Sequence, residues 1–324
     1  MPTIAEDEKH KSTRRRRVLL AVVVAAVLIA APAIGFFLVF VQPNDDWFVR
    51  VNGQEIQRSV LVEMLRVEKI EASLEGRRFD LGSRAFGAAA ELTEDEVLRQ
   101  QADLFGGLPE DDVVDIRIRA LLLATESGGD QAAIGESEIS ELLRRYLDQR
   151  RLSEGSFRDQ MAAAILRSQA TAILGSTLPS VQPQIHVHRI LTADRDSANL
   201  VLQRAEAGTP FEQLATAYSL ADDDGDLGWL PYDALPEHVA DYLWGVEPLV
   251  TSLPIEEPSG AFALYVVSGR DTSRAVDPEH VPQIEERAFE AWMSASLAEQ
   301  EIDVRLDSSM LDWLAQEMAK TRIP

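Results

Sequence analysis

The sequence contains no cysteine among its 324 residues. This absence excludes disulfides, thiolate metal sites, a cysteine nucleophile and lipidation through an N-terminal cysteine. Histidine is scarce, with five in the chain, and no pair has the HExxH spacing of a helical zinc site. Neither a GxSxG nucleophile elbow nor a GxxxxGK[ST] phosphate loop occurs. The sequence therefore offers no motif for these chemistries, and we expect neither a cofactor nor a metal.

Beyond the N-terminus and the uncharged run that follows it, positive charge is outweighed by negative charge. The chain has a net charge of −23, yet residues 1–17 have six cationic against three acidic side chains, a net +3. The remaining residues therefore have a net charge of −26. A body this acidic repels phosphate backbones, so we expect no nucleic-acid partner.

A long apolar run, residues 18–41, contains no charged side chain. As a helix it would be about 36 Å long, enough to cross a hydrocarbon core of about 30 Å. Arginines at residues 14–17 lie immediately before it, so the positive-inside rule places the N-terminus in the cytoplasm and the later residues outside. The alternative is a signal peptide cleaved at APA, residues 31–33. The apolar run continues well past that point, which favours a retained transmembrane anchor.

The segment 42–178 has the patterns of a helical module with a short strand at its start. VRV followed by Asn52-Gly53 predicts a strand and a tight turn, and Ser59 is a candidate N-cap for the next helix. Two helices are predicted between residues 137 and 175, separated by SEGS at residues 153–156. Their apolar stripes are Ile139, Leu142, Leu143, Tyr146 and Leu147 in the first, and Phe157, Met161 and Ile165 in the second.

Two stretches of this segment show a family pattern. They are VNGQEIQRSVL, residues 51–61, and ESEISELLRRYLDQRRLSEGSFRDQMAAAILRSQA, residues 136–170. Both resemble the SurA-like N-terminal domain of bacterial foldases. The resemblance implies a helical chaperone domain that holds unfolded polypeptide in an apolar groove. An ordinary helical bundle is the alternative.

Residues 179–272 follow a different order of elements. The patterns predict a strand, two helices, an acidic loop, a strand over DLGWL, a helix over PEHVADYLWG, and closing strands over LVTSLPI and FALYVV. Two motifs stand within this order: G-x-x-F-x-x-L-A-x-x-Y-S, Gly208 to Ser219, and G-D-L-G-W, Gly225 to Trp229. Together they closely resemble the parvulin, or PpiC-type, peptidyl-prolyl isomerase domain. The resemblance implies a βα3βαβ2 fold.

The acidic loop between these motifs could suggest a calcium site. Asp222, Asp224 and Asp226 match the alternation of an EF-hand loop. However, Leu227 stands where that loop requires glycine, and no glutamate follows at the required place. We therefore expect a solvated turn within the family's active-site loop, and no metal.

The resemblance also assigns the catalytic positions, and these are substituted here. Parvulins place two histidines and a cysteine or aspartate behind the X–Pro bond. These positions fall on Arg189, Ala263 and Ala221, and the family's threonine position falls on or near Glu257. We therefore expect weak or absent isomerase activity, so the sequence leaves open whether the chain is an enzyme.

The substrate surface is better retained than the catalytic groups. The resemblance places Leu235 and Val239 in the apolar proline pocket, and Ser259 and Trp229 in the surface around it. We therefore expect this surface to bind a prolyl peptide even if rotation about the X–Pro bond is not accelerated.

An alignment shifted by one residue at two sites is the alternative. His188 would then take the position of Arg189, and Asp222 that of Ala221, which would restore part of a site. Neighbours in a strand point to opposite faces, so the shift at His188 is disfavoured.

The tail, residues 273–324, predicts a helix, a short strand over IDVRL and a last helix capped by Ser308 or Ser309. In SurA-like foldases such helices often pack on the chaperone domain, and the resemblance implies the same here. A free amphipathic tail is the alternative.

The sequence thus predicts an α+β protein. Its segments are a basic cytoplasmic N-terminus at 1–17, a transmembrane helix at 18–41, a SurA-like helical chaperone domain at 42–178, a parvulin-type domain at 179–272 and C-terminal helices at 273–324. We expect a single-pass foldase of the bacterial cytoplasmic membrane that binds unfolded or secreted polypeptides outside it. The alternative is a non-catalytic scaffold or adaptor for one envelope partner.

Overall fold

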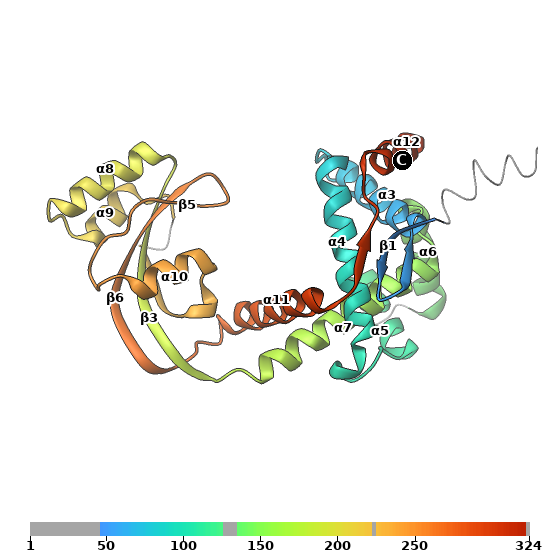
Figure 1. Cartoon of the computed structure of the whole chain (residues 1–324), viewed down its shortest axis with the longest axis horizontal. Coiled ribbons are helices and arrows are strands. Elements are labelled where there is room, and N and C mark those ends of the chain that lie inside the picture. The colour runs from blue at the N-terminus through green and yellow to red at the C-terminus, as the bar shows by residue number, and fades with distance from the viewer. Residues whose placement is uncertain (1–45, 126–134, 222–224, 322–324) are drawn as a thin grey trace, which may run out of the picture. The chain divides into compact units, whose positions relative to one another are not determined.

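The computed structural model describes residues 46–125, 135–221 and 225–321 (Figure 1). These residues form two compact units, which are described separately. Unit 1 holds the described residues up to Leu166 and those from Ser296 on, and unit 2 is Arg167–Ala295. The divisions fall inside two helices, α7 (Glu154–Ser176) and α11 (Val281–Glu299). The sequence-based domain boundaries instead follow residues 178 and 272.

Unit 1 begins with a hairpin. β1 (Trp47–Val51) and β2 (Gln54–Gln57) are joined by Asn52 and Gly53, whose φ angles are 50° and 84°. Positive φ at both central residues is typical of a type I′ turn, which Asn-Gly accommodates. The predicted strand and turn are confirmed. β2 was not predicted, because its sequence QEIQ is mostly polar and exposed.

Helices make up most of unit 1. They are α3 (Arg58–Leu74), α4 (Leu81–Gln100), the 3-10 helix η2 (Ala102–Phe105), α5 (Asp111–Thr125), α6 (Glu136–Arg150) and the first part of α7. The two predicted helices between residues 137 and 175 are α6 and α7, and their apolar stripes meet α5 in one core cluster. Phe157, 1% exposed, lies at its centre and contacts the ring of Tyr146 at 5.2 Å between centroids.

The C-terminal segment completes unit 1. β7 (Ile302–Val304) pairs antiparallel with β1, which gives the strand order β2-β1-β7. α12 (Ser308–Lys320) packs on α3 and α4 and buries Met310, Leu314 and Met318. The predicted strand over IDVRL and the predicted last helix are confirmed.

The predicted N-cap Ser59 is wrong. β2 runs directly into α3, so the helix begins at Arg58 and Ser59 lies inside its first turn. Gln57 occupies the N-cap position and makes no side-chain cap hydrogen bond. The end of the preceding strand, rather than a capping side chain, sets the start of this helix.

The predicted cap of α12 by Ser308 or Ser309 is also wrong. Asp307 is the N-cap, and its carboxylate accepts a hydrogen bond from the backbone N–H of Met310 at 2.9 Å. Hydrogen bonds from Ser309 and Met310 lower the pKa of Asp307. A carboxylate is the better cap here because it also carries charge toward the positive end of the helix dipole.

Unit 2 is a four-stranded antiparallel sheet with helices on both faces. Its strands are β3 (Val181–Thr192), β4 (Asp226–Pro231), β5 (Ile255–Glu256) and β6 (Phe262–Ala275), in the order β4-β3-β6-β5. α8 (Arg195–Glu206) and α9 (Phe211–Tyr218) connect β3 to β4, and η4 (Tyr232–Ala234) and α10 (Glu237–Gly245) follow β4. Among the described residues two helices, not three, lie between β3 and β4. The strand predicted over LVTSLPI is mostly absent from this described segment. Only the short β5 and an isolated bridge at Thr251 form there.

Each face of this sheet has its own core cluster. α10 packs with Ile185 and Val187 of β3, whereas α8 and α9 pack with Ile190 of the same strand. Figure 1 shows α10 on one side of the sheet and α8 and α9 on the other. The α+β class predicted from sequence is confirmed.

No helix in the described part of the chain is both long and apolar enough to cross a membrane. The predicted anchor, residues 18–41, lies outside the described residues. Its membrane insertion therefore stays a prediction.

Candidate functional site

The face of the unit 2 sheet that α10 covers brings several predicted site positions together. Ile185 and Val187 point to this face, and Arg189 continues the alternation along β3. Arg189 pairs with Tyr265 of β6, and Tyr265 and Ala263 both belong to the cluster packed against α10. Arg189, Ala263 and Tyr265 therefore share what we call the α10 face.

Tyr265 is the polar centre of the α10 face. It is 3% exposed, and its hydroxyl donates to a carboxylate oxygen of Glu257 at 2.7 Å. Burial, followed by this hydrogen bond, raises the pKa of Tyr265 well above its usual value, and the charge of Arg189 opposes the shift. Its phenol is therefore neutral throughout the physiological pH range. The face thus holds a phenol, a carboxylate and a guanidinium.

The predicted proline-pocket residues lie deep in the cluster of the α10 face. Leu235 is 5% exposed and Val239 is 0% exposed. Both side chains are used to pack α10 on the sheet, so they offer little surface to a proline ring. Ser259 lies in the exposed turn between β5 and β6, where its hydroxyl accepts a hydrogen bond from Ala261 N at 3.4 Å.

Two other predicted residues lie on the opposite face. Trp229 contacts His186 at 5.2 Å between ring centroids and is absent from the cluster of Leu235 and Val239. His188 also lies on this second face, because it alternates with Arg189 along β3 and pairs with Val266. The structure therefore does not bring His188 to the position of Arg189.

The loop that follows α9 is held against β3. Ser219 Oγ accepts hydrogen bonds from the N–H groups of Leu191 and Ala221, both at 3.3 Å. At the other end of the loop, Arg189 N donates to Gly225 O at 2.7 Å. Asp222, the residue of the shifted alignment, lies outside the described residues, so its role stays a prediction.

The chain is similar to a curated chaperone and to solved isomerase structures. No protein-family model matches the chain. The curated chaperone SurA of Methylococcus capsulatus is 30% identical over 84 residues, which are 25% of this chain and 18% of that chaperone. Among solved structures, the peptidylprolyl isomerase PrsA from Bacillus anthracis is 17% identical, with 72% of this chain and 97% of that chain covered and a TM-score of 0.39. The parvulin domain of PpiD from E. coli is 28% identical, covering 29% of this chain and 92% of that domain, with a TM-score of 0.24.

The chain resembles parvulin-type isomerases and SurA-like chaperones. The resemblance predicted from the sequence is therefore confirmed. That Arg189 and Ala263 occupy the family's histidine positions stays a prediction from the resemblance. Tyr265 was missed, although the signal was available: it follows Ala263 by two residues in a strand and so shares its face.

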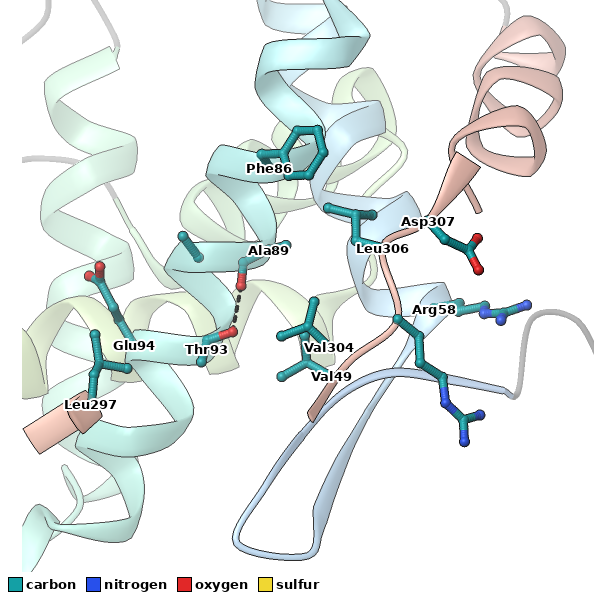
Figure 2. Close-up of a pocket in the computed structure, with 12 residues that line it drawn as sticks. Val49, Arg58, Phe86, Ala89, Thr93, Glu94, Leu297, Val304, Leu306 and Asp307 are labelled. Atoms are coloured by element: carbon teal, nitrogen blue, oxygen red, sulfur yellow. Dashed lines mark hydrogen bonds between the residues drawn. The ribbon is translucent and has the colours of Figure 1, made fainter. Parts of the chain in front are cut away.

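Unit 1 has a pocket of about 730 Å³. Figure 2 shows that α4 forms one wall and the C-terminal segment the other. Phe86 and Leu306 point toward one another across it, and the hydroxyl of Thr93 is turned back to the carbonyl oxygen of Ala89 at 2.7 Å. Phe86 is 55% exposed, which is unusual for so large an apolar side chain. The pocket wall is thus mainly apolar and open.

β7 presents an open edge beside this pocket. It is the last strand of its sheet, and it bonds to β1 through Arg305 N to Phe48 O and Asn52 N to Glu301 O, at 2.7 and 2.9 Å. In an antiparallel ladder the intervening residues turn their backbone groups the other way. The N–H and C=O groups of Val304 and Leu306, which line the pocket, therefore face away from β1.

Proposed function

We propose that this protein is an extracytoplasmic foldase that binds unfolded, proline-containing segments of secreted proteins, with weak or absent isomerase activity. A foldase or chaperone of parvulin type is the class that the similarities support. The observation that carries the proposal is the apolar pocket of unit 1 beside the open edge of β7. An unfolded chain offers the two features that this arrangement can match, namely unpaired backbone groups for the edge of β7 and apolar side chains for the pocket wall.

An extended peptide fits the pocket by strand addition. Its backbone would pair with Val304 of β7 and with Leu306, which follows β7, and alternate side chains would point toward Phe86 of α4. Backbone pairing is independent of sequence, so many clients could bind in this way. Apolar contact with Phe86 then favours the segments that a folded protein would have buried.

Weak isomerase activity follows from the groups on the α10 face. The barrier to rotation of an X–Pro bond is about 18–20 kcal/mol, and enzymes lower it by favouring the twisted amide electrostatically. Arg189 and Tyr265 can donate hydrogen bonds but cannot exchange protons near neutral pH. Any acceleration would therefore rest on fixed donors alone.

A refolding assay with the full chain tests the proposal. Substoichiometric amounts are expected to suppress aggregation of several unrelated denatured clients, and Phe86→Glu should abolish the effect because it puts a charge at the pocket wall. Ile116→Glu is the matched control, since Ile116 is 67% exposed on α5 of the same unit but outside the pocket. Equal loss with both variants would contradict the pocket assignment.

An X–Pro isomerisation assay without a coupling protease supplies the second readout. We expect rates close to the uncatalysed background from the unsubstituted chain. Strong acceleration that Asp222→Ala or His188→Ala removes would contradict the alignment and make the protein an ordinary isomerase.

A dedicated adaptor is the second candidate function, because a fold with altered catalytic positions can still bind. It is favoured if no client's aggregation is suppressed while one envelope protein is captured through the α10 face. The buried Leu235 and Val239, which leave little room for a general prolyl pocket, are the observation in its favour.

Membrane anchoring is part of the proposal. Its support is the uncharged run at residues 18–41 and the arginines at residues 14–17 before it. With this anchor, both units would lie outside the cytoplasmic membrane, where secreted chains emerge unfolded.

A further inference from the structure

Four polar side chains gather on the face of the unit 2 sheet opposite the α10 face, and the proposed function uses none of them. His186 and His188 are two residues apart in β3 and so point to the same side. Asp226 belongs to β4 and Ser268 to β6, the two strands that flank β3. We call these four residues the histidine patch.

Both imidazoles of the histidine patch face one carboxylate oxygen. His186 Nε2 lies 3.3 Å from Asp226 Oδ1, and His188 Nδ1 lies 3.9 Å from the same atom. Ligand atoms of the three residues lie within 4.8 Å of one another. The two histidine side chains are largely shielded, at 23% and 16% exposed, whereas that of Asp226 is 53% exposed. Solvent therefore reaches the histidine patch mainly from the side of Asp226, whereas the two histidines are held within the surface.

Ser268 fixes the orientation of both rings. Its Oγ lies 2.7 Å from His186 Nδ1 and 3.0 Å from His188 Nε2, and its hydroxyl reaches the carbonyl oxygen of His186 at 3.4 Å. A hydroxyl has one hydrogen and two lone pairs. When that hydrogen is on the carbonyl, both rings donate to Ser268, and the nitrogens that face Asp226 carry lone pairs. Two lone pairs then converge on a carboxylate oxygen that accepts a hydrogen bond from Gly228 N at 2.9 Å, an arrangement that a cation stabilises.

Two β-bulges create the histidine patch. Against β4, Val187 pairs with Gly228 and His188 with Asp226, so Leu227 is the extra residue and Gly228 has a φ of 75°. In regular pairing Leu227 would stand opposite His188, and the bulge puts the carboxylate there instead. Against β6, a second bulge makes Ser268 the extra residue. Bulges re-aim side chains and are frequent next to functional sites.

We propose that the histidine patch binds a divalent transition metal ion, with zinc the best match, through His186, His188 and Asp226. Two imidazole nitrogens and one carboxylate oxygen form a typical three-residue zinc set, with water in the fourth position. Tetrahedral bonds of about 2.0–2.1 Å separate ligand atoms by roughly 3.3 Å. The His186–Asp226 pair has this spacing already, and the exposed Asp226 has only a small distance to move toward His188.

Ser268 is then a positioning residue, since metal-binding histidines commonly donate their second N–H to an oxygen atom. This inference departs from the expectation of no metal, which rested on motif spacing within single segments. It is independent of the proposed function, because the histidine patch and the α10 face lie on opposite sides of the sheet.

A proton is the competing occupant. His186 could donate from Nε2 to Asp226 and accept from Ser268 at Nδ1, and the same distances would result. Metal titration separates the two cases. We would titrate the full chain, purified without a histidine tag, with zinc chloride by calorimetry and with cobalt chloride by visible absorption.

We expect one zinc per chain, intense four-coordinate cobalt bands, and a dissociation constant at least about 10-fold higher in His188→Ala and in Asp226→Asn. Ser268→Ala should weaken binding by about 10- to 100-fold with the stoichiometry unchanged. His238→Ala, an exposed histidine on α10, is the matched control and should leave binding unchanged.

Three results would overturn the metal site. They are the absence of saturable zinc binding up to about 100 μM, binding of magnesium as tight as that of zinc, and a zinc affinity that neither His188→Ala nor Asp226→Asn reduces. Circular dichroism of each variant, and the more conservative Asp226→Asn beside His188→Ala, separates loss of ligand from loss of fold.

Discussion

At the residue scale, the exchange of imidazoles for other groups on the α10 face changes what can titrate there. Histidine changes charge near neutral pH, whereas Arg189 does not and Ala263 has no ionisable group. Tyr265 enters from the same strand as Ala263, but its raised pKa keeps it neutral far above neutral pH. The phenol of Tyr265 therefore adds no titrating charge to the α10 face near neutral pH.

The raised pKa of Tyr265 predicts how stability depends on pH. Below the ordinary tyrosine value of 10.0, the phenol is neutral in both folded and unfolded chains, so the free energy of unfolding does not depend on its pKa. Above it, the unfolded chain ionises while the folded chain does not, so stability is lost as pH rises toward the folded pKa. In Tyr265→Phe this loss should be absent.

Urea unfolding followed by near-ultraviolet circular dichroism at about pH 8 and about pH 10.5 measures the difference. The midpoint of the unsubstituted chain should fall more between the two values than that of Tyr265→Phe. Tyr265→Phe should itself lower the free energy of unfolding by about 1–3 kcal/mol, because it removes the hydrogen bond to Glu257. The quantity to compare is therefore the change of each protein's midpoint between the two pH values, and not the midpoint itself. An equal change of midpoint in the two proteins would contradict the buried, neutral phenol.

Sequence reasoning found some site residues and missed others for definite physical reasons. Arg189 and Ala263 could be proposed for the family's histidine positions because each family motif has a fixed residue spacing within one strand. The histidine patch could not, because Asp226 and Ser268 reach His188 only through two bulges, and a bulge shifts pairing without leaving a reliable mark in composition. The spacing rules that exclude a helical zinc site say nothing about a site built across three strands.

At the element scale, Gly225 joins the loop that follows α9 to β4. Its φ is 76°, and an added Cβ would lie 2.7 Å from Ala215 Cβ and 2.9 Å from Arg189 O. Only glycine allows both the left-handed backbone and the close approach of the loop to β3. The hydrogen bond from Arg189 N to Gly225 O depends on the same approach.

Gly225→Ala is therefore expected to destabilise unit 2 strongly. Gly260→Ala is the matched control, since Gly260 has a φ of 82° but no atom within 4 Å of an added Cβ. The left-handed backbone alone should cost about 1–2 kcal/mol at either position. At Gly225 the clash should add about 1–3 kcal/mol. Hydrogen exchange of the Ile190 amide in β3 reports the difference, and equal protection in both variants would refute the packing argument.

Elements with strong periodicity were predictable, and those without it were not. α6 and α7 follow from apolar stripes that the core then uses. β2 has no such stripe, and it exists because Asn52 and Gly53 fold the chain back on β1. The N-caps of α3 and α12 were predicted at the wrong residues. The end of β2 sets the start of α3, and Asp307, rather than a neighbouring serine, caps α12.

At the scale of the whole molecule, the absence of cysteine makes the predicted topology easy to test. Glu299→Cys introduces a single thiol at an exposed position of α11. If residues 18–41 anchor the chain with its N-terminus inside, a membrane-impermeant maleimide should label this thiol in intact cells. Labelling only after lysis would contradict the orientation, and the unsubstituted chain is the blank.

The pocket of unit 1 draws its walls from residues 49–94 and from residues 297–307, with all of unit 2 encoded between them. A ribosome making this chain must therefore finish unit 2 before the second wall emerges. Until then β1 pairs with β2 alone, so the newborn protein has an open strand edge on the other side of β1. If the pocket holds clients as proposed, client capture becomes possible only after all of unit 2 has been synthesised.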